Sequence, residues 1–115
     1  MIDWKRLCQL HEEVGPDEFR PILELFRDEI ESVVLRLDPN DGAALEAQLH
    51  FLRGGACNLG LREFAALCQA GEALASTGRA READLGALTE AWARARRMLM
   101  HDLEKLALRG AGDAV

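Results

Sequence analysis

Apolar residues recur every three or four positions along most of the chain, a spacing that predicts amphipathic helices. In the N-terminal half the clearest series begins at Phe19 and ends at Leu37. In the C-terminal half, positions from Leu85 to Leu106 alternate steps of three and four, which is typical of a seam between packed helices. The pattern contains no strand, so the sequence predicts an all-α fold.

Turn and capping residues divide this pattern into five predicted helices. Their approximate ranges are 3–14, 17–37, 41–58, 62–76 and 82–108. Asp3 and either Asn40 or Asp41 are suitable N-caps, because their side chains can accept hydrogen bonds from free backbone N–H groups. Gly60 is suited to a left-handed C-cap. Pro21 interrupts the second range and predicts either a kink or a helix that properly begins near it.

Short connections between long helices make neighbouring helices antiparallel. The sequence therefore predicts an antiparallel up-and-down four-helix bundle with a short N-terminal helix capping one end. At 115 residues the chain fits one domain, which we place at 1–109. The segment 110–115, rich in Gly and Ala, is expected to be a frayed C-terminal tail.

Charge and cysteine content narrow the range of functions. The formal net charge of −6 argues against nucleic acid as the main partner, because binding phosphates requires clustered Lys and Arg. No apolar run approaches 18 residues, and the N-terminus does not resemble a signal peptide, so we expect a cytoplasmic protein without a membrane span. Three cysteines without a Cys-x-x-Cys pair are interpreted as reduced and mostly buried.

The candidate chemistry lies on the third predicted helix. His50 falls one position off the apolar face formed by residues 45–59, near the edge of the exposed face. Arg53 and Gly54, three and four residues later, share the same surface as His50. A glycine inside a helix costs about 1 kcal/mol relative to alanine, so Gly54 suggests that another molecule comes close at this point.

The segment 49–61 resembles the signature of histidine phosphotransfer (HPt) domains of bacterial multistep phosphorelays. That signature is His, any residue, Leu, Lys or Arg, Gly, a small residue, Ala or Ser, two variable residues, an apolar residue and Gly. The matching positions are His50, Leu52, Arg53, Gly54, Ala56, Leu59 and Gly60. Two departures are mild, since Arg53 stands where Lys is commoner and Gly55 where Ser is commoner. The similarity extends over nearly the whole chain.

The resemblance implies that Nε2 of His50 accepts a phosphoryl group from an aspartyl phosphate on a receiver domain and passes it to another receiver aspartate. Arg53 would stabilise the phosphate, and Gly54 would leave room for the partner. Phe51 either points outward into a docking patch or lies in a groove between helices. Gly55 is a further candidate binding residue, with helix packing as its alternative.

The sequence contains no ATP-binding loop, and no acidic cluster that could hold Mg²⁺ stands beside His50. We therefore expect a monomeric phosphocarrier rather than an enzyme, with no bound metal or cofactor, whose partner supplies Mg²⁺. The expected partners are response-regulator receiver domains or a hybrid histidine kinase. The competing interpretation is a bundle that binds and regulates a signalling partner without being phosphorylated. A third, weaker interpretation is a kinase fragment that uses His11, which Glu12 and Pro16 follow.

Overall fold

The computed structural model describes the backbone of residues 4–113 and the side chains of residues 5–101. Within this part of the chain every element is helical, which confirms the all-α prediction. The α-helices are α1 (Trp4–Val14), α2 (Pro16–Val34), α3 (Gly42–Leu59), α4 (Arg62–Ser76) and α5 (Leu85–Asp113), and the 3-10 helix η1 (Ala80–Glu82) lies between α4 and α5.

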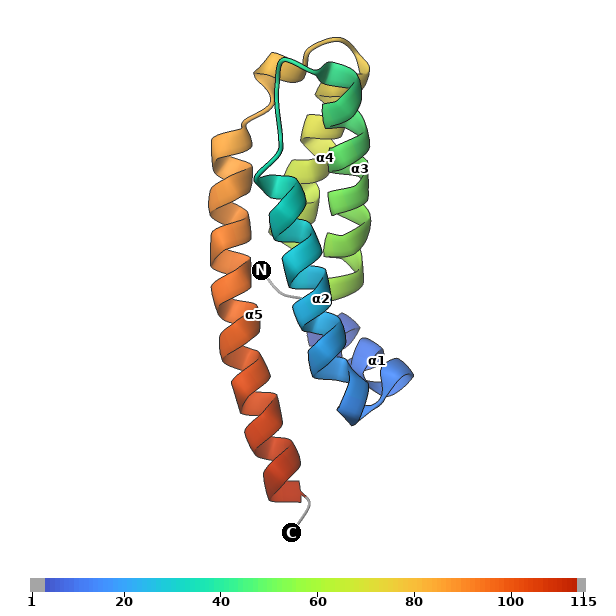
Figure 1. The fold of residues 1–115 in the computed structure, drawn as a ribbon, viewed down its shortest axis with the longest axis vertical. Coiled ribbons are helices and arrows are strands. Elements are labelled where there is room, and N and C mark those ends of the chain that lie inside the picture. The colour runs from blue at the N-terminus through green and yellow to red at the C-terminus, as the bar shows by residue number, and fades with distance from the viewer. Residues whose placement is uncertain (1–3, 114–115) are drawn as a thin grey trace.

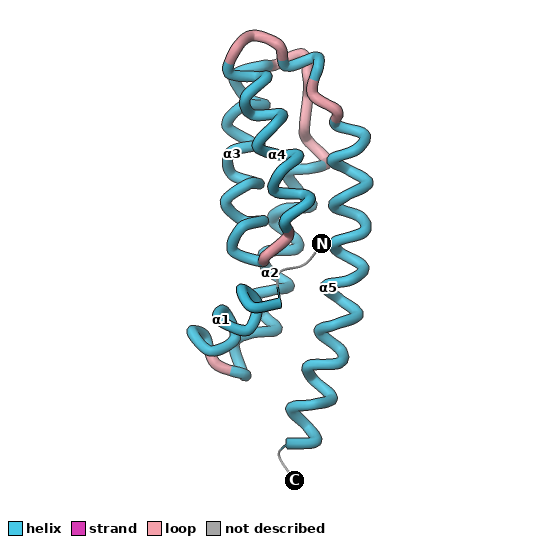
Figure 2. The backbone as a smooth tube through the Cα atoms, turned by 180° about the vertical axis from the view of Figure 1, so that it is seen from behind, coloured by secondary structure: helices cyan, strands magenta, loops and turns pink. Residues whose placement is uncertain are grey.

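The four longer helices lie around one interior. Helix α2 contacts α3 and α5, and α4 contacts the same two helices from the other side. In Figure 1 the chain ascends through α2 and α4 and descends through α3 and α5. Helix α1 packs against α2 and α3 at the lower end of the bundle in both views (Figures 1 and 2). The contact between α3 and α4 is the most extensive, and it is the one that forms the candidate site.

Most helix ends follow the local signals in the sequence. Gly15, at φ +84°, separates α1 from α2 in a conformation that costs glycine little. The side chain of Asp41 caps α3 by accepting a hydrogen bond from the N–H of Ala44 at 3.2 Å. Gly60 ends α3 in the left-handed conformation, as predicted, at φ +71°. The predicted N-cap Asp3 lies outside the described residues.

Helix α2 begins at Pro16 and continues through Pro21 to Val34. The interpretation that the helix starts near Pro21 is therefore wrong. Pro16 occupies the first turn, where its missing N–H would have no partner inside the helix in any case. Asp17 and Glu18 follow it, and their negative charges interact favourably with the positive N-terminal end of the helix dipole.

The bounds of α5 differ from the prediction at both ends. The helix begins at Leu85 instead of Glu82, because Asp84 Oδ1 accepts a hydrogen bond from the N–H of Ala87 at 2.9 Å and caps it. It also continues to Asp113, past the predicted end near Leu108. Since no proline interrupts 109–113, each further residue can add one backbone hydrogen bond. The division into a domain and a tail at residue 109 stays a prediction.

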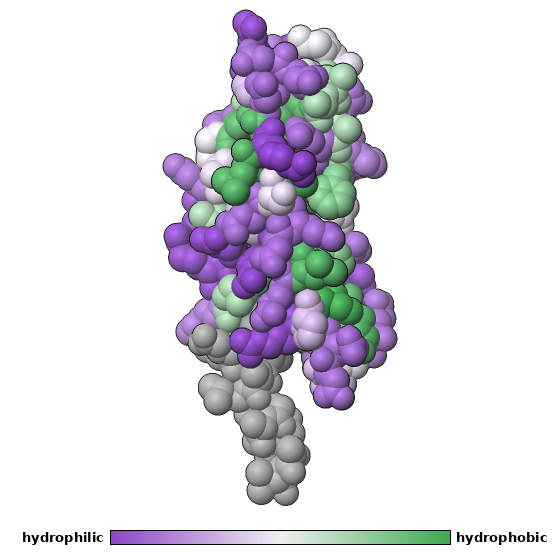
Figure 3. Space-filling model, in the orientation of Figure 1, coloured by the Kyte–Doolittle hydropathy of each residue, from purple (hydrophilic) through white to green (hydrophobic). Residues whose placement is uncertain are grey.

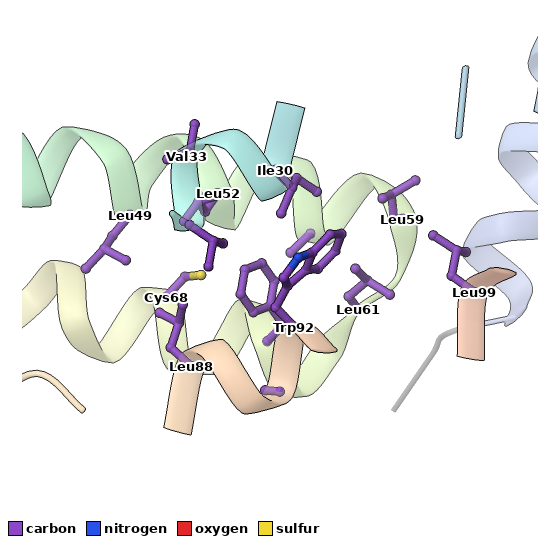
Figure 4. Packing of buried hydrophobic residues seen from close by; sticks show 14 of the residues in the cluster. Ile30, Val33, Leu49, Leu52, Leu59, Leu61, Cys68, Leu88, Trp92 and Leu99 are labelled. Carbon is purple, nitrogen blue, oxygen red and sulfur yellow. The ribbon is translucent and has the colours of Figure 1, made fainter. Parts of the chain in front are cut away.

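One hydrophobic core fills the interior (Figure 4). Side chains from α2, α3, α4 and α5 meet there, and Phe64 lies 5.6 Å from Trp92 between ring centroids. Among the cysteines Cys68 belongs to this core, whereas Cys8 and Cys57 are exposed free thiols. The prediction that the cysteines are mostly buried is thus wrong for two of the three. Each exposed thiol directly follows a buried residue, Leu7 or Ala56, and the helical turn carries it away from the core.

The surface visible in Figure 3 is largely hydrophilic, with hydrophobic atoms gathered in smaller separate areas. Among the side chains that the structure describes, Leu25, Leu35 and Phe51 are the large exposed hydrophobic ones. Among the described residues, no helix is both long enough and apolar enough to cross a membrane.

Candidate functional site

His50 lies in the middle of α3, on the side that faces away from the core. Its neighbours Leu49 and Leu52 are completely buried, as are the other predicted core residues of this helix, so the predicted buried face is correct. The side chain of His50 is 66% exposed. The imidazole is therefore within reach of a partner molecule.

The close approach of α4 determines what lies beside His50. A Cβ atom at Gly71 would come within 2.7 Å of Leu49 Cδ1, so the absence of a side chain at residue 71 lets the two helices pack tightly. Leu49 directly precedes His50, and Gly71 directly precedes Glu72. This register places the carboxylate of Glu72 against the imidazole, with Glu72 Oε1 2.8 Å from His50 Nδ1.

Glu72 is a candidate site residue that no pattern in the sequence indicated. Its side chain is only 19% exposed, and its second oxygen, Oε2, is buried without a hydrogen bond among the described residues. The guanidinium Nε of Arg53 lies 3.5 Å from Oε2, which makes an ion pair. Glu72 thus connects two residues that the sequence had already placed on one surface.

The arrangement favours one tautomer of His50. A carboxylate can only accept a hydrogen bond, so the contact with Glu72 requires a proton on Nδ1. Arg53 Nη2 lies 3.1 Å from the same nitrogen, but it could donate to Nδ1 only if that proton were absent. Because the carboxylate is charged and closer, and because Arg53 can pair with Oε2 instead, we assign Nδ1 as the donor to Glu72. In the neutral ring the lone pair then resides on Nε2.

Gly54 leaves the flank of the imidazole open. It lies one helical turn after His50, and a Cβ atom placed there would meet no atom within 4 Å. Close packing between helices therefore does not explain this glycine. The next residue differs, because a Cβ atom at Gly55 would lie 3.5 Å from Ile30 Cδ1 on α2. At Gly55 the geometry favours the alternative, helix packing.

Phe51 combines both of its predicted placements. It lines a surface groove together with Val33 of α2 and Arg36 of the turn that follows α2, and it remains 47% exposed. An apolar ring of this kind, one residue after His50, can contact a partner that covers the imidazole.

The other histidines lack comparable surroundings. The ring of His11 is half-buried and packs edge-on against Phe19, with 4.8 Å between the ring centroids. His101 is exposed near the end of the described side chains. Among the described residues no group of three or more His, Cys, Asp or Glu side chains could hold a metal ion.

Comparisons with known proteins give one match. The family described as "Hpt domain" matches residues 21–108, a range that contains His50, Arg53, Gly54 and Glu72. No curated protein and no solved structure matches the chain. Because the family match spans well over half of the sequence, the chain belongs to the Hpt domain family.

Proposed function

We propose that this chain is a phosphocarrier in which Nε2 of His50 accepts a phosphoryl group from an aspartyl phosphate of one receiver domain and delivers it to an aspartate of another. Hpt domains serve histidine phosphotransfer in phosphorelays, which gives the class of reaction. The observation that carries the proposal is the exposed His50 ring with Nδ1 held 2.8 Å from Glu72 Oε1.

The chemistry follows from that contact. The Nε2 lone pair attacks phosphorus, an Nε2–P bond forms, and the P–O bond to the aspartate breaks, so that the carboxylate leaves with the electron pair. The phosphorylated ring keeps its Nδ1 proton and carries positive charge on the imidazole. Glu72 accepts the hydrogen bond from Nδ1 and balances this charge. The return step to a second aspartate reverses these bond changes.

Arg53 has a complementary role on the phosphoryl side. Its side chain is 35% exposed, and it lies beside both the ring of His50 and the carboxylate of Glu72. Phosphoryl transfer depends mainly on positioning and on stabilising charge over the phosphoryl oxygens. On phosphorylation the guanidinium, with Nη2 3.1 Å from the ring, can donate hydrogen bonds to those oxygens. Mg²⁺ and the remaining charge stabilisation would come from the receiver.

The bundle supports this role as an antiparallel four-helix scaffold that presents His50 from a rigid helix. We propose that it acts as a cytoplasmic monomer, with receiver domains or a hybrid histidine kinase as partners and without enzymatic activity of its own. A single scattering peak at the mass of one chain, with and without phosphorylation, is the expected result for a monomer.

The test is transfer from a receiver domain that carries a radiolabelled aspartyl phosphate. The expected product is label on this chain that is lost in acid and stable in base, as a phosphohistidine is. His50→Gln should abolish the label, whereas the matched variants His11→Gln and His101→Gln should keep it. Binding of the receiver without any transfer would contradict the carrier and support an interaction module. Label that persists in His50→Gln and disappears in His11→Gln would move the acceptor to α1.

A further inference from the structure

A basic cleft lies beside the phosphotransfer site, between α1, the second half of α3 and the first half of α4. Its volume is about 430 Å³. Four cationic side chains line it, namely Lys5, Arg6, Arg53 and Arg62, and no carboxylate is among the lining residues. Glutamines from α1 and α4 add neutral hydrogen-bonding groups, and small alanines form much of the remaining wall.

The concentration of positive charge here is unusual for this chain. The protein has 14 Lys and Arg residues against 20 Asp and Glu, so a concave surface with four cations and no anion is opposite in sign to the chain as a whole. The four cations differ in exposure, since Arg6 and Arg53 are half-buried and contact carboxylates outside the cleft. Arg6 Nη1 lies 3.5 Å from Glu13 Oε1, and Arg53 Nε lies 3.5 Å from Glu72 Oε2. Lys5 and Arg62 are exposed, at α1 and at the start of α4.

Arg53 joins this cleft to the site of chemistry. It lines the cleft and also lies 3.1 Å from the imidazole of His50. A protein that brings an aspartyl phosphate to Nε2 therefore meets Arg53, which is also part of the wall of the cleft. Such a protein also carries the carboxylates that hold its Mg²⁺, because this ion prefers oxygen ligands. Its approaching face is therefore rich in acidic groups.

Resting on the function proposed above, we propose that the basic cleft is the docking site for an acidic segment of the receiver domain that exchanges phosphoryl groups with His50. The segment would lie across α1 and the start of α4, with its carboxylates near Lys5 and Arg62, while the phosphorylated aspartate reaches His50. Charges at the rim of an interface mainly raise the association rate and select the partner. The cleft thus sets which receivers this chain recognises, separately from the chemistry at His50.

The experiment compares two double variants that each remove two positive charges. Lys5→Gln/Arg62→Gln removes them from the cleft, whereas Arg81→Gln/Arg97→Gln removes them from exposed positions on η1 and α5. Initial transfer rates from a labelled receiver are measured over a range of receiver concentrations at low salt. Circular dichroism melting confirms that both variants remain folded.

The cleft variant should raise the half-saturating receiver concentration by about tenfold and leave the rate at saturation nearly unchanged, the pattern of lost binding without lost chemistry. It should also weaken the dependence of that concentration on salt, because screening then has fewer charges to act on. The control variant should behave like wild type.

Equal half-saturating concentrations in the two double variants would overturn the docking site while leaving phosphorylation of His50 intact. A lower saturating rate in the cleft variant with unchanged half-saturation would also overturn it, because Lys5 and Arg62 would then act on the chemistry. If wild type acquires no label on His50 from any receiver tested, the proposed function fails and the docking site fails with it. A last experiment measures binding to vesicles of anionic lipid. If the cleft variant loses this binding but exchanges phosphoryl groups with the receiver like wild type, the docking site is overturned and the cleft is assigned to a membrane.

Discussion

Replacing Glu72 tests whether the contact with Nδ1 of His50 contributes to phosphoryl transfer. Glu72→Gln keeps an oxygen that can accept from Nδ1 but removes the negative charge, and Glu72→Ala removes both. The 2.8 Å contact joins a carboxylate that is 19% exposed to a ring that is 66% exposed. The contact should therefore gain most in the phosphorylated state, when the ring carries positive charge.

The magnitude follows from that exposure. Hydrogen bonds to charged groups contribute about 1.5–3 kcal/mol, and exposed ion pairs contribute about 0.2–1 kcal/mol. A contact between a mostly buried carboxylate and a mostly exposed ring falls between these ranges, at about 1–2 kcal/mol. The equilibrium constant for phosphorylation of His50 should therefore fall by about 5- to 30-fold in Glu72→Ala. Glu72→Gln should fall less, because its amide oxygen still accepts from Nδ1.

The assay is rapid-quench transfer from a labelled receiver, followed to equilibrium so that the rate and the final distribution of label are both read. The matched control is Glu63→Gln, which changes another carboxylate of α4, 49% exposed and paired with Arg94 at 2.7 Å. Nitrogen-15 NMR of the His50 ring adds a readout that a purely structural role would not change. Wild type should show the proton on Nδ1, and Glu72→Ala should lose this preference. If the Glu72 variants match Glu63→Gln in equilibrium and tautomer, the role assigned to Glu72 is refuted.

Four further predictions address the rest of the structure. Arg53→Ala should slow transfer by about tenfold, measured by rapid quench. It should lower the free energy of unfolding by under about 1 kcal/mol in urea, since its ion pair is partly exposed. A large loss of stability would instead make Arg53 a structural residue. Gly54→Gln should leave the melting temperature unchanged or raised, because glycine costs about 1 kcal/mol in a helix. The same variant should bind the receiver more weakly, as measured by calorimetry, because its side chain fills the open flank of His50. Normal binding would contradict this role of Gly54. Trp92→Ala should lower stability by about 3–5 kcal/mol in urea unfolding, since the residue is 3% exposed; a smaller loss would mean that the core collapses around the site. Burial raises the pKa of the Cys68 thiol from 9.0 to about 12, so above pH 9 the unfolded state loses this proton before the folded state does. The free energy of unfolding should then fall by up to about 1.4 kcal/mol per pH unit. Urea unfolding at several pH values measures this slope, which should be smaller in Cys68→Val.

Local features of the sequence determined the helices and half of the candidate site. The buried face of α3 and the left-handed Gly60 each depend on residues within one or two turns of one another, and the structure agrees with both. For the N-cap of α3 the sequence offered Asn40 or Asp41, and the structure selects Asp41. The shared surface of His50, Arg53 and Gly54 is also a local feature, because positions three and four apart lie on the same side of a helix in any fold. The start of α5 could also have been predicted from the sequence, because Asp84 is a common type of N-cap residue. The apolar pattern by itself does not show this cap.

Only the tertiary structure brought Glu72 to His50. The two residues are 22 positions apart on different helices, and no spacing rule within a helix relates them. Their contact depends on how far α4 slides along α3, which the packing of Leu49 against the bare backbone of Gly71 determines. The basic cleft also depends on the tertiary structure, because its cations come from three helices that meet only when the bundle forms. Helix periodicity thus shows which face of a helix is exposed, whereas close packing decides which exposed faces share a site.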